Sequence, residues 1–263
     1  MLGAIIGDIA GSTYEFTTNK SVEIPLFPPN SDYTDDTVMT IATAFAVLGQ
    51  HDYGQTYVTY GRRYPDPMGG YGSGFRSWLL QAHPKPYGSW GNGSAMRVSP
   101  IGWAFDTLEE VLIQAERSAA VSHNHIEGIK GAQATAVAIW MARSGSSKAE
   151  MKSAIMARFG YDLSRSVDEV RFNYAFNESC QRTVPESIIA FLASNDFENA
   201  IRLAISLGGD ADTVGCITGA IAHAFYKEIP GEMISEAESR IPEEFKEVLV
   251  AFSTKYDIKT RTS

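Results

Sequence analysis

The chain has 263 residues, 44% of them hydrophobic and 20% charged, which is enough to bury a substantial core and argues against disorder. A formal net charge of −9 argues against nonspecific nucleic-acid binding, because that mode needs clustered Lys and Arg to neutralise phosphates. No apolar run is long enough to span a bilayer and the N-terminus lacks the basic start of a signal peptide, so we expect a soluble cytoplasmic protein with no membrane partner.

The first predicted helix, in "MLGAIIGDIAG", carries a glycine at every fourth residue. Gly3, Gly7 and Gly11 share one face and cost the helix about 0.5–1 kcal/mol each relative to alanine, which suggests close packing in a helical core. Asp8 either faces solvent beside these glycines or is buried, in which case it needs hydrogen-bond donors or a cation. Glu15 follows at the end of this helix, where the first long loop begins.

The second predicted helix starts at "YTDDTVMT", residues 33–40, where Asp35 and Asp36 stand between two threonines. Its apolar face is formed by Val38, Ile41, Ala42, Phe45 and Leu48. Asp and Thr oxygens cap helix starts, and negative charge suits the helix dipole there, but one carboxylate is enough for that purpose. The motif alone therefore leaves capping and metal binding both open.

Most of the remaining chain consists of Ala-rich helical segments, so we predict an all-α protein, a compact helical bundle with a single domain over residues 1–263. These segments are "TLEEVLIQAERSAAV", "IEGIKGAQATAVAIWMA", "KAEMKSAIMARF", "PESIIAFLA", "ENAIRLAISL", "TVGCITGAIAHAFY" and "PEEFKEVLVAF". The best candidate strand, "QTYVTY" at residues 55–60, lies inside a plausible helix. Cys180 and Cys216 are too few for a disulfide framework, and we interpret them as small buried side chains.

Long loops interrupt the helices at residues 17–32, 64–74 and 82–94, and long ordered loops are more often functional than idle. "GGYGSGF" and "GSWGNGSAMR" can offer backbone N–H groups to a phosphate, with Tyr71 or Trp90 near a ribose or base. His123 and His125 of "SHNH" either cap the next helix or contact a ligand. The other histidines, which have no constellation around them, are read as structural or surface residues: His51, His83 and His223.

A second acidic helix start, "LGGDADTVGC" at residues 207–216, repeats the pattern of the first. It places Asp210, Asp212 and Thr213 before another strongly apolar helix. If the two starts meet, four carboxylates and two or three hydroxyls surround one cavity, and two divalent cations would balance the charge. Hard oxygen donors without Cys or His favour Mg²⁺ or Mn²⁺ over Zn²⁺.

These motifs, in this order, resemble those of the ADP-ribosylglycohydrolase family, also called ADP-ribosyl-acceptor hydrolases, from Leu2 to about Tyr226. The resemblance implies an all-α fold with two Mg²⁺ (or Mn²⁺) ions, and a substrate that is an ADP-ribose-bearing protein or small molecule. It assigns metal binding to Thr34, Asp35, Asp36, Asp210, Asp212 and Thr213, and a catalytic role to Glu15 together with Asp35 and Asp36. It assigns ADP-ribose binding to Gly72, Ser89, Trp90, Gly91, Asn92, Gly93 and His123.

The glycine-rich segments look more like those of members that cleave O-linked ADP-ribose, as in ADP-ribosylserine or O-acetyl-ADP-ribose. Arginine-directed members carry an acidic residue in the segment that corresponds to Tyr71–Phe75, whereas no carboxylate lies between Asp66 and Asp106 here. Three alternatives stay open: an ADP-ribosylarginine hydrolase, a catalytically silent ADP-ribose-binding protein, and a Mg²⁺-dependent hydrolase of another nucleotide or phosphate ester. The intact motif carboxylates argue against the silent protein.

Overall fold

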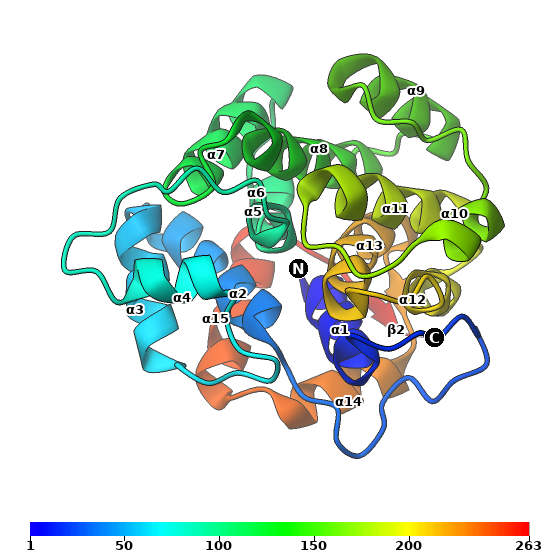
Figure 1. Ribbon diagram of the computed structural model, residues 1–263, viewed down its shortest axis with the longest axis horizontal. Helices are drawn as coiled ribbons and strands as arrows, with labels where there is room; N and C mark the ends of the chain where they lie inside the picture. The colour runs from blue at the N-terminus through cyan, green and yellow to red at the C-terminus, as the bar shows by residue number, and fades with distance from the viewer. Residues whose placement is uncertain (263) are drawn as a thin grey trace.

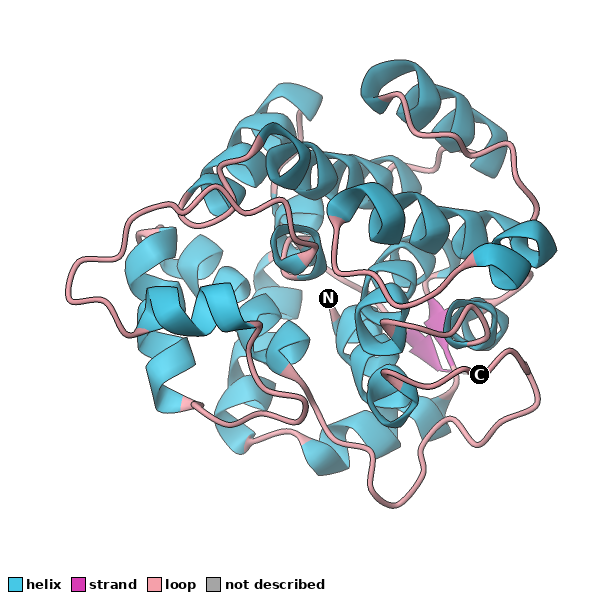
Figure 2. Cartoon of the chain, in the orientation of Figure 1, coloured by secondary structure: helices cyan, strands magenta, loops and turns pink. Residues whose placement is uncertain are grey.

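The computed structural model describes residues 1–262, and its ribbon is almost entirely helical (Figure 1, Figure 2). Residues 1–143 form α1 (Leu2–Gly11), the 3₁₀ turn η1 (Ser12–Tyr14), α2 (Asp35–Gly49), α3 (Tyr53–Arg63), α4 (Ser73–Leu79), α5 (Gly93–Met96), α6 (Ser99–Ala104), α7 (Leu108–Ala120) and α8 (Ile126–Arg143). The following residues form α9 (Lys148–Phe159), α10 (Val167–Asn173), α11 (Cys180–Ala193), α12 (Phe197–Ile205), α13 (Ala211–Tyr226), α14 (Gly231–Arg240) and α15 (Glu243–Lys255). The all-α prediction is confirmed.

Besides the helices, the described residues contain one parallel pair of two-residue strands, β1 (Glu228–Ile229) and β2 (Arg261–Thr262). Nothing in the sequence pattern predicts this pair. It ties the chain just after α13 to the far end of the described residues.

The glycine face of α1 packs against α13 in the antiparallel sense, near the centre of the molecule (Figure 1). A Cβ atom on Gly7 would lie 2.0 Å from the carbonyl oxygen of Gly215, and one on Gly3 would lie 2.3 Å from that of Gly219. Only glycine permits two helix backbones to approach this closely. At the other end of the contact Gly11 meets Ala211, so the end of α1 lies beside the acidic start of α13.

Asp8 is fully buried and joins α1 to the start of α2. Its carboxylate accepts hydrogen bonds from the backbone N–H of Thr34 (3.1 Å), the hydroxyl of Thr34 (2.7 Å), the backbone N–H of Thr37 (3.1 Å) and the hydroxyl of Thr37. The buried alternative is therefore correct, and the donors come from α2. Helix α1 thus fixes both acidic helix starts, one through Asp8 and the other through its glycines.

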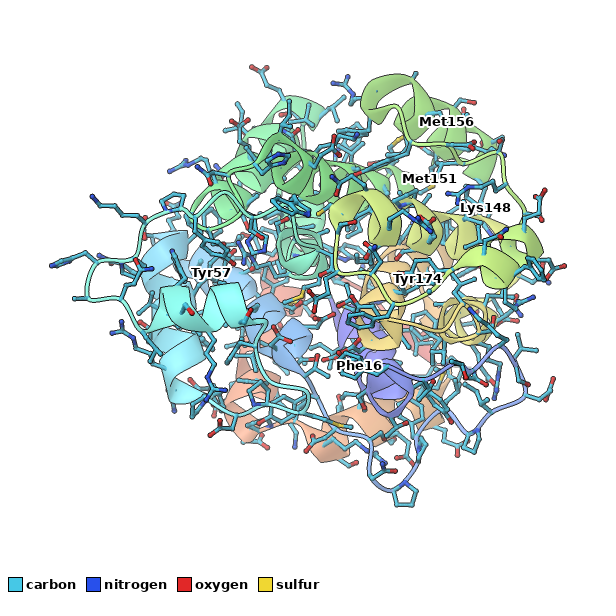
Figure 3. All side chains as sticks on the ribbon, viewed as in Figure 1. Phe16, Tyr57, Lys148, Met151, Met156 and Tyr174 are labelled. Carbon is cyan, nitrogen blue, oxygen red and sulfur yellow. The ribbon has the colours of Figure 1, made fainter. Side chains whose placement is uncertain are left out.

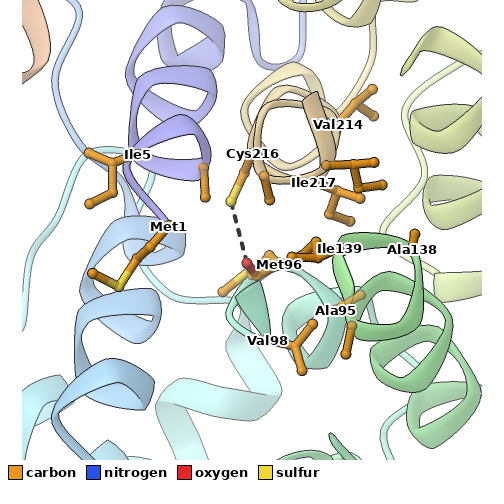
Figure 4. Packing of buried hydrophobic residues seen from close by; sticks show 14 of the residues in the cluster. Met1, Ile5, Ala95, Met96, Val98, Ala138, Ile139, Val214, Cys216 and Ile217 are labelled. Atoms are coloured by element: carbon orange, nitrogen blue, oxygen red, sulfur yellow. Dashed lines mark hydrogen bonds between the residues drawn. The ribbon is translucent and has the colours of Figure 1, made fainter. Parts of the chain in front are cut away.

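The rest of the core is built around α13 and α2. Helices α8, α11 and α12 pack on α13, while α3, α6 and α15 pack on α2. Figure 4 shows α13 over α5, where the Cys216 thiol donates to the carbonyl oxygen of Met96 at 3.4 Å. Both cysteines are buried and free, as predicted.

Two local predictions need correction. Phe45, placed on the apolar face of the second helix, is 40% exposed and stacks on His51 with the ring centroids 5.0 Å apart. Helix α11 begins at Cys180 rather than at Pro185, so the proline lies inside it. Pro185 is the sixth residue of α11, beyond the four positions whose N–H groups lack partners, so it removes one intrahelical hydrogen bond, while the burial of Cys180 favours the longer helix.

Candidate functional site

A pocket of about 240 Å³ opens where the starts of α2 and α13 meet two glycine-rich loops. Its lining residues are Glu15, Phe16, Asp35, Asp36, Gly69, Gly70, Tyr71, Gly72, Ser73, Gly74, Phe75, Tyr87, Ser89, Gly91, Asn92, Gly93, Met96, Arg97, His123, Phe176, Glu178, Asp210, Asp212 and Thr213. Both acidic helix starts therefore face one cavity. We call the side formed by Glu15, Asp35, Asp36, Asp210, Asp212 and Thr213 the acidic wall. The side formed by the lining residues within 69–75 and 87–97, together with His123, is called the glycine-rich wall.

Three carboxylates of the acidic wall lie within metal-binding reach of one another. One oxygen each from Glu15, Asp210 and Asp212 lies within 4.8 Å of the others. Asp36 is 1% exposed; its Oδ1 accepts a hydrogen bond from the Thr213 hydroxyl at 3.3 Å, and its Oδ2 has no partner among the described residues. This bond joins the start of α2 directly to the start of α13.

Burial, and after it the crowding of like charges, shifts the pKa values of the acidic wall upward. Burial, followed by the negative charges of Asp212, Asp8 and Glu178, raises the pKa of Glu15 to about 8. Burial raises the pKa of Asp210 to about 6 and holds the pKa values of Asp36 and Asp212 well above their usual range. Buried carboxylates in this state need protons or cations to offset their charge.

The donor set fits a hard divalent cation. The wall offers carboxylate oxygens and the Thr213 hydroxyl, and the unpaired Asp36 Oδ2 is a buried acceptor without a donor. Oxygen donors of this kind bind Mg²⁺, Mn²⁺ or Ca²⁺ rather than soft metals.

The Thr34 hydroxyl does not face this pocket. It donates to Asp8 at 2.7 Å and accepts from the backbone N–H of Asp36 at 3.2 Å, so it caps α2. Thr34 is 1% exposed and is not among the lining residues. Its placement is that of a helix cap behind the acidic wall.

The glycine-rich wall brings together most of the residues expected to bind ADP-ribose. Gly72, Ser89, Gly91, Gly93 and His123 all line the pocket. The glycines bring the loop backbone close to His123, because a Cβ on Gly93 would lie only 3.0 Å from its Nε2.

Asn92 connects the two walls. Its Nδ2 donates to Asp210 Oδ2 at 2.6 Å and to the Thr183 hydroxyl at 3.0 Å. Its backbone N–H donates to the carbonyl oxygen of Glu178 at 2.7 Å. The amide thus orients one carboxylate of the acidic wall from the opposite loop.

Two of the candidate side chains lie away from the pocket interior. Trp90 is 55% exposed, is not among the lining residues, and packs its ring edge against His125 with centroids 5.6 Å apart. His125 caps α8 by accepting a hydrogen bond from the backbone N–H of Glu127. Of the two histidines in "SHNH", one therefore faces the pocket and the other caps the helix. The remaining histidines are structural or surface residues, as predicted: His223 is buried against Gly3 and Thr260, while His51 and His83 are exposed.

The sequence model of a family described as ADP-ribosylglycohydrolase matches residues 1–257. The chain belongs to the ADP-ribosylglycohydrolase family. It is 27% identical to the human (Homo sapiens) protein named ADP-ribosylhydrolase ARH3, over 86% of this chain and 84% of that relative. It is also 27% identical to ADP-ribosylarginine hydrolase Tri1 of Pseudomonas putida (strain GB-1), over 86% of this chain and 69% of that protein. A solved structure titled "ADP-ribosylglycohydrolase-related protein complex" superposes with a TM-score of 0.72 at 26% identity, covering 98% of this chain and 97% of the other.

Membership in this family makes the protein a hydrolase, and the family acts on ADP-ribosylated substrates. No helix among the described residues is long and apolar enough to cross a membrane.

Sequence reasoning missed several residues that line this pocket. Glu178 and Phe176 come from the non-helical segment between α10 and α11, which has no periodic pattern to mark it. Phe176 lies against Phe16 with ring centroids 4.7 Å apart at the pocket mouth; Figure 3 shows Phe16 in the chain beyond α1. Phe16 has a φ of 61°, which a non-glycine residue rarely adopts and which could have been inferred only from the structure.

A larger groove, of about 1430 Å³, lies between α2, α3, α7 and the loop at residues 82–86. It contains none of the motif carboxylates and none of the loop residues that match the family. Size alone therefore does not identify the functional site of this protein.

Proposed function

We propose that the protein is a binuclear Mg²⁺- or Mn²⁺-dependent hydrolase that cleaves the bond between the anomeric carbon of ADP-ribose and its acceptor. The observation that carries this proposal is the meeting of the two acidic helix starts in a pocket whose other wall is rich in glycine. Cations at one wall and a diphosphate along the other would place the ribose between them.

The assigned metal ligands are Asp35, Asp36, Asp210, Asp212 and Thr213, with Thr34 contributing through the position of the α2 start. When bound, the cations would bind the ribose hydroxyls and orient a water toward the anomeric carbon. Asp36 and Thr213 are already joined by a hydrogen bond, and Asn92 holds Asp210, so the ligands are oriented before anything binds.

Hydrolysis adds water across the bond: the acceptor leaves with the bonding electrons and takes a proton, and the water oxygen joins the anomeric carbon and gives one up. Glu15 is the proposed proton-transfer group, since it lies at the edge of the acidic wall and is partly exposed. Its Oε2 lies 2.9 Å from where a Cβ on Gly69 would stand, so the glycine-rich loop limits its position. Positive charge that builds on the sugar would be stabilised by the carboxylates nearby.

The preferred substrate class is O-linked ADP-ribose, as in ADP-ribosylserine or O-acetyl-ADP-ribose. Support comes from the glycine-rich segment at residues 69–75, which contributes no carboxylate to the pocket. A second candidate is ADP-ribosylarginine. It is favoured by the relative named ADP-ribosylarginine hydrolase and by Glu178, a lining carboxylate that could pair with a guanidinium.

The test is to incubate the protein with ADP-ribosylserine peptide, ADP-ribosylarginine peptide and O-acetyl-ADP-ribose, each with Mg²⁺ or with EDTA. We expect release of free ADP-ribose only with the metal, fastest from an O-linked substrate. Faster cleavage of the arginine peptide would select the second candidate. Tight ADP-ribose binding without turnover would instead indicate a silent binding protein, and phosphate release from nucleotides with all three bonds intact would indicate a different hydrolase.

A further inference from the structure

Arg97 is a buried cation without a carboxylate partner. It is 1% exposed, lines the pocket, and forms none of the ion pairs found among the described residues. Its guanidinium lies over the ring of Tyr57, 4.3 Å from the centroid; Tyr57 is labelled on α3 in Figure 3. Burying a charge is costly unless hydrogen bonds satisfy it, so the neighbours of Arg97 matter.

The neighbours of Arg97 lead to His123. Arg97 Nη2 donates to the carbonyl oxygen of Ser118 at 2.9 Å and to Ser122 Oγ at 3.0 Å. Ser122 Oγ lies 2.7 Å from His123 Nδ1. Arg97, Ser122 and His123 therefore form one buried chain of hydrogen bonds that ends at the pocket.

The direction of this chain follows from the chemistry of its first member. A guanidinium can only donate, so Ser122 Oγ accepts from it and keeps its own proton to donate. The described residues offer that proton one acceptor, His123 Nδ1. If Nδ1 carried a hydrogen, Ser122 Oγ would face two donors, and its own proton would be buried without a partner, because Ser122 is 0% exposed.

We propose that Arg97 and Ser122 are positioning residues that fix His123 as the Nε2–H tautomer, a neutral hydrogen-bond donor aimed into the glycine-rich wall. Nε2 is the ring atom nearest to Gly93, and no hydrogen bond among the described residues reaches it. Burial and then the charge of Arg97 lower the pKa of His123 well below its usual range, which keeps the ring neutral.

A fixed neutral donor suits one kind of ligand atom, an anionic oxygen that already has backbone N–H groups nearby. In ADP-ribose this is a diphosphate oxygen, and here the inference rests on the proposed function. A bare Nε2 in the other tautomer would face the same oxygen with a lone pair and repel it. The tautomer therefore decides whether His123 helps or opposes binding.

Nitrogen chemical shifts of the imidazole ring, measured by NMR on the whole labelled protein, test the first part directly. The five histidines are separated by comparison with His123→Gln, which removes one set of signals. At neutral pH we expect His123 with Nε2 protonated and Nδ1 bare. A protonated Nδ1 in the wild-type protein would overturn the proposal.

Ser122→Ala tests the chain, with Ser118→Ala as its matched control. Both serines are fully buried, but the Ser118 hydroxyl bonds to Tyr57 Oη at 2.7 Å and not to His123. We expect Ser122→Ala to give a mixture of tautomers and to raise the Kd for ADP-ribose about tenfold, since a good donor is partly lost. We expect Ser118→Ala to leave both quantities unchanged. A single Nε2–H tautomer with an unchanged Kd in Ser122→Ala would overturn the proposal.

Arg97→Met extends the test to the first member of the chain. Without the guanidinium donor, Ser122 Oγ can either donate to His123 Nδ1 or accept from it, so we expect a mixture of the two His123 tautomers. A folded Arg97→Met with a single Nε2–H tautomer would remove Arg97 from the proposal. Because the ring shifts are read without ligand, they test the chain even if wild-type protein binds no ADP-ribose. Absence of ADP-ribose binding would count against the proposed function instead.

Discussion

The acidic wall brings together buried carboxylates at Asp36, Asp210 and Asp212, whereas the glycine-rich wall buries one guanidinium, Arg97, behind a neutral imidazole. Although both line one pocket, none of the ion pairs among the described residues joins Arg97 to these carboxylates. Because these opposite charges do not pair, one side of the pocket is negatively charged and the other side is positively charged. Such a pocket fits a ligand that brings cations to one end and anionic oxygens to the other.

The two walls also differ in how they are held. The acidic wall depends on backbone contact between α1 and α13 and on the hydrogen bonds of Asp8, which fix two helix starts in space. The glycine-rich wall depends on side-chain contacts to a loop, such as those of Asn92 and Ser122. We therefore expect substitutions in the first wall to abolish chemistry and those in the second to weaken binding.

The largest expected effect is that of Asp212→Asn. The amide keeps the shape and can still accept from the backbone N–H of Thr213, but it removes a charge needed for cations. We expect kcat/KM for the preferred ADP-ribosylated substrate to fall on the order of 10³-fold or more. We also expect the metal-free variant to melt above the metal-free wild-type protein, because one of several crowded like charges is gone.

Asp52→Asn is the matched control for Asp212→Asn. Asp52 caps α3 by accepting from the backbone N–H of Gln55 at 2.8 Å, and it lies outside the acidic wall. An asparagine caps a helix as well as an aspartate, so this variant should keep full activity. If Asp212→Asn were equally harmless, Asp212 would be only an acidic residue in the first turn of α13, and the dimetal assignment would be wrong.

A smaller effect is expected in the pH dependence of metal stabilisation. Burial raises the pKa of Asp210 from its ordinary value of 3.8 to about 6, and burial with nearby negative charge raises that of Glu15 from 4.5 to about 8. The native metal-free protein therefore holds these protons more tightly than the unfolded chain. The contribution of these protons to the free energy of unfolding is fully present below about pH 4 and is lost as the pH rises through 6 and then 8. For Asp210 the loss is about 3 kcal/mol, at about 1.4 kcal/mol per pKa unit.

Cations compete with those protons, so their stabilising effect should grow over the same pH range. We expect the Tm in Mg²⁺ minus the Tm in EDTA to be near zero at pH 5 and to increase toward pH 8, at about 2–4 °C per kcal/mol. Burial lowers the pKa values of His123 and His223, which costs stability as the pH falls through their ordinary value near 6.5. The histidines lower the Tm equally in Mg²⁺ and in EDTA, so their effect cancels in the difference between the two Tm values. A difference independent of pH would contradict the crowding of charge on the acidic wall.

The acidic wall could be predicted from sequence because its signal is local. Two carboxylates beside a threonine at an apolar helix start are visible at Asp35 and again at Asp210. Because oxygen ligands of this kind bind hard divalent cations, the two starts could be assigned to one metal site, and both line the same pocket. The glycines of α1 also predicted close packing, but not that Gly7 would face Gly215. A helix face indicates that a neighbour is needed without saying which helix supplies it.

The residues that sequence reasoning missed have no such local signal. Glu178 lies in an irregular segment, and its place in the pocket depends on the hydrogen bond from Asn92 to its carbonyl oxygen. Arg97 stands inside a motif that was recognised, yet arginine is usually exposed, and its burial appears only in the structure. Trp90 shows the reverse: its sequence neighbours line the pocket, but its own side chain turns outward.

The smallest expected effect, Gly93→Ala, tests the glycine-rich wall alone. Gly93 begins α5, and its new Cβ would lie 3.0 Å from His123 Nε2 and 3.3 Å from Cε1, which is close enough to displace the ring from its position. We expect KM and the Kd for ADP-ribose to rise about tenfold with little change in kcat, because the acidic wall is untouched.

Gly231→Ala is the control for this variant, since Gly231 begins α14 and its added Cβ would meet no atom within 4 Å. Both changes favour the helix slightly, so helix propensity cannot account for a difference between them. If Gly93→Ala lowered kcat as strongly as Asp212→Asn, the division of labour between the walls would be wrong. If it left KM unchanged, the imidazole of His123 would not be part of the binding surface.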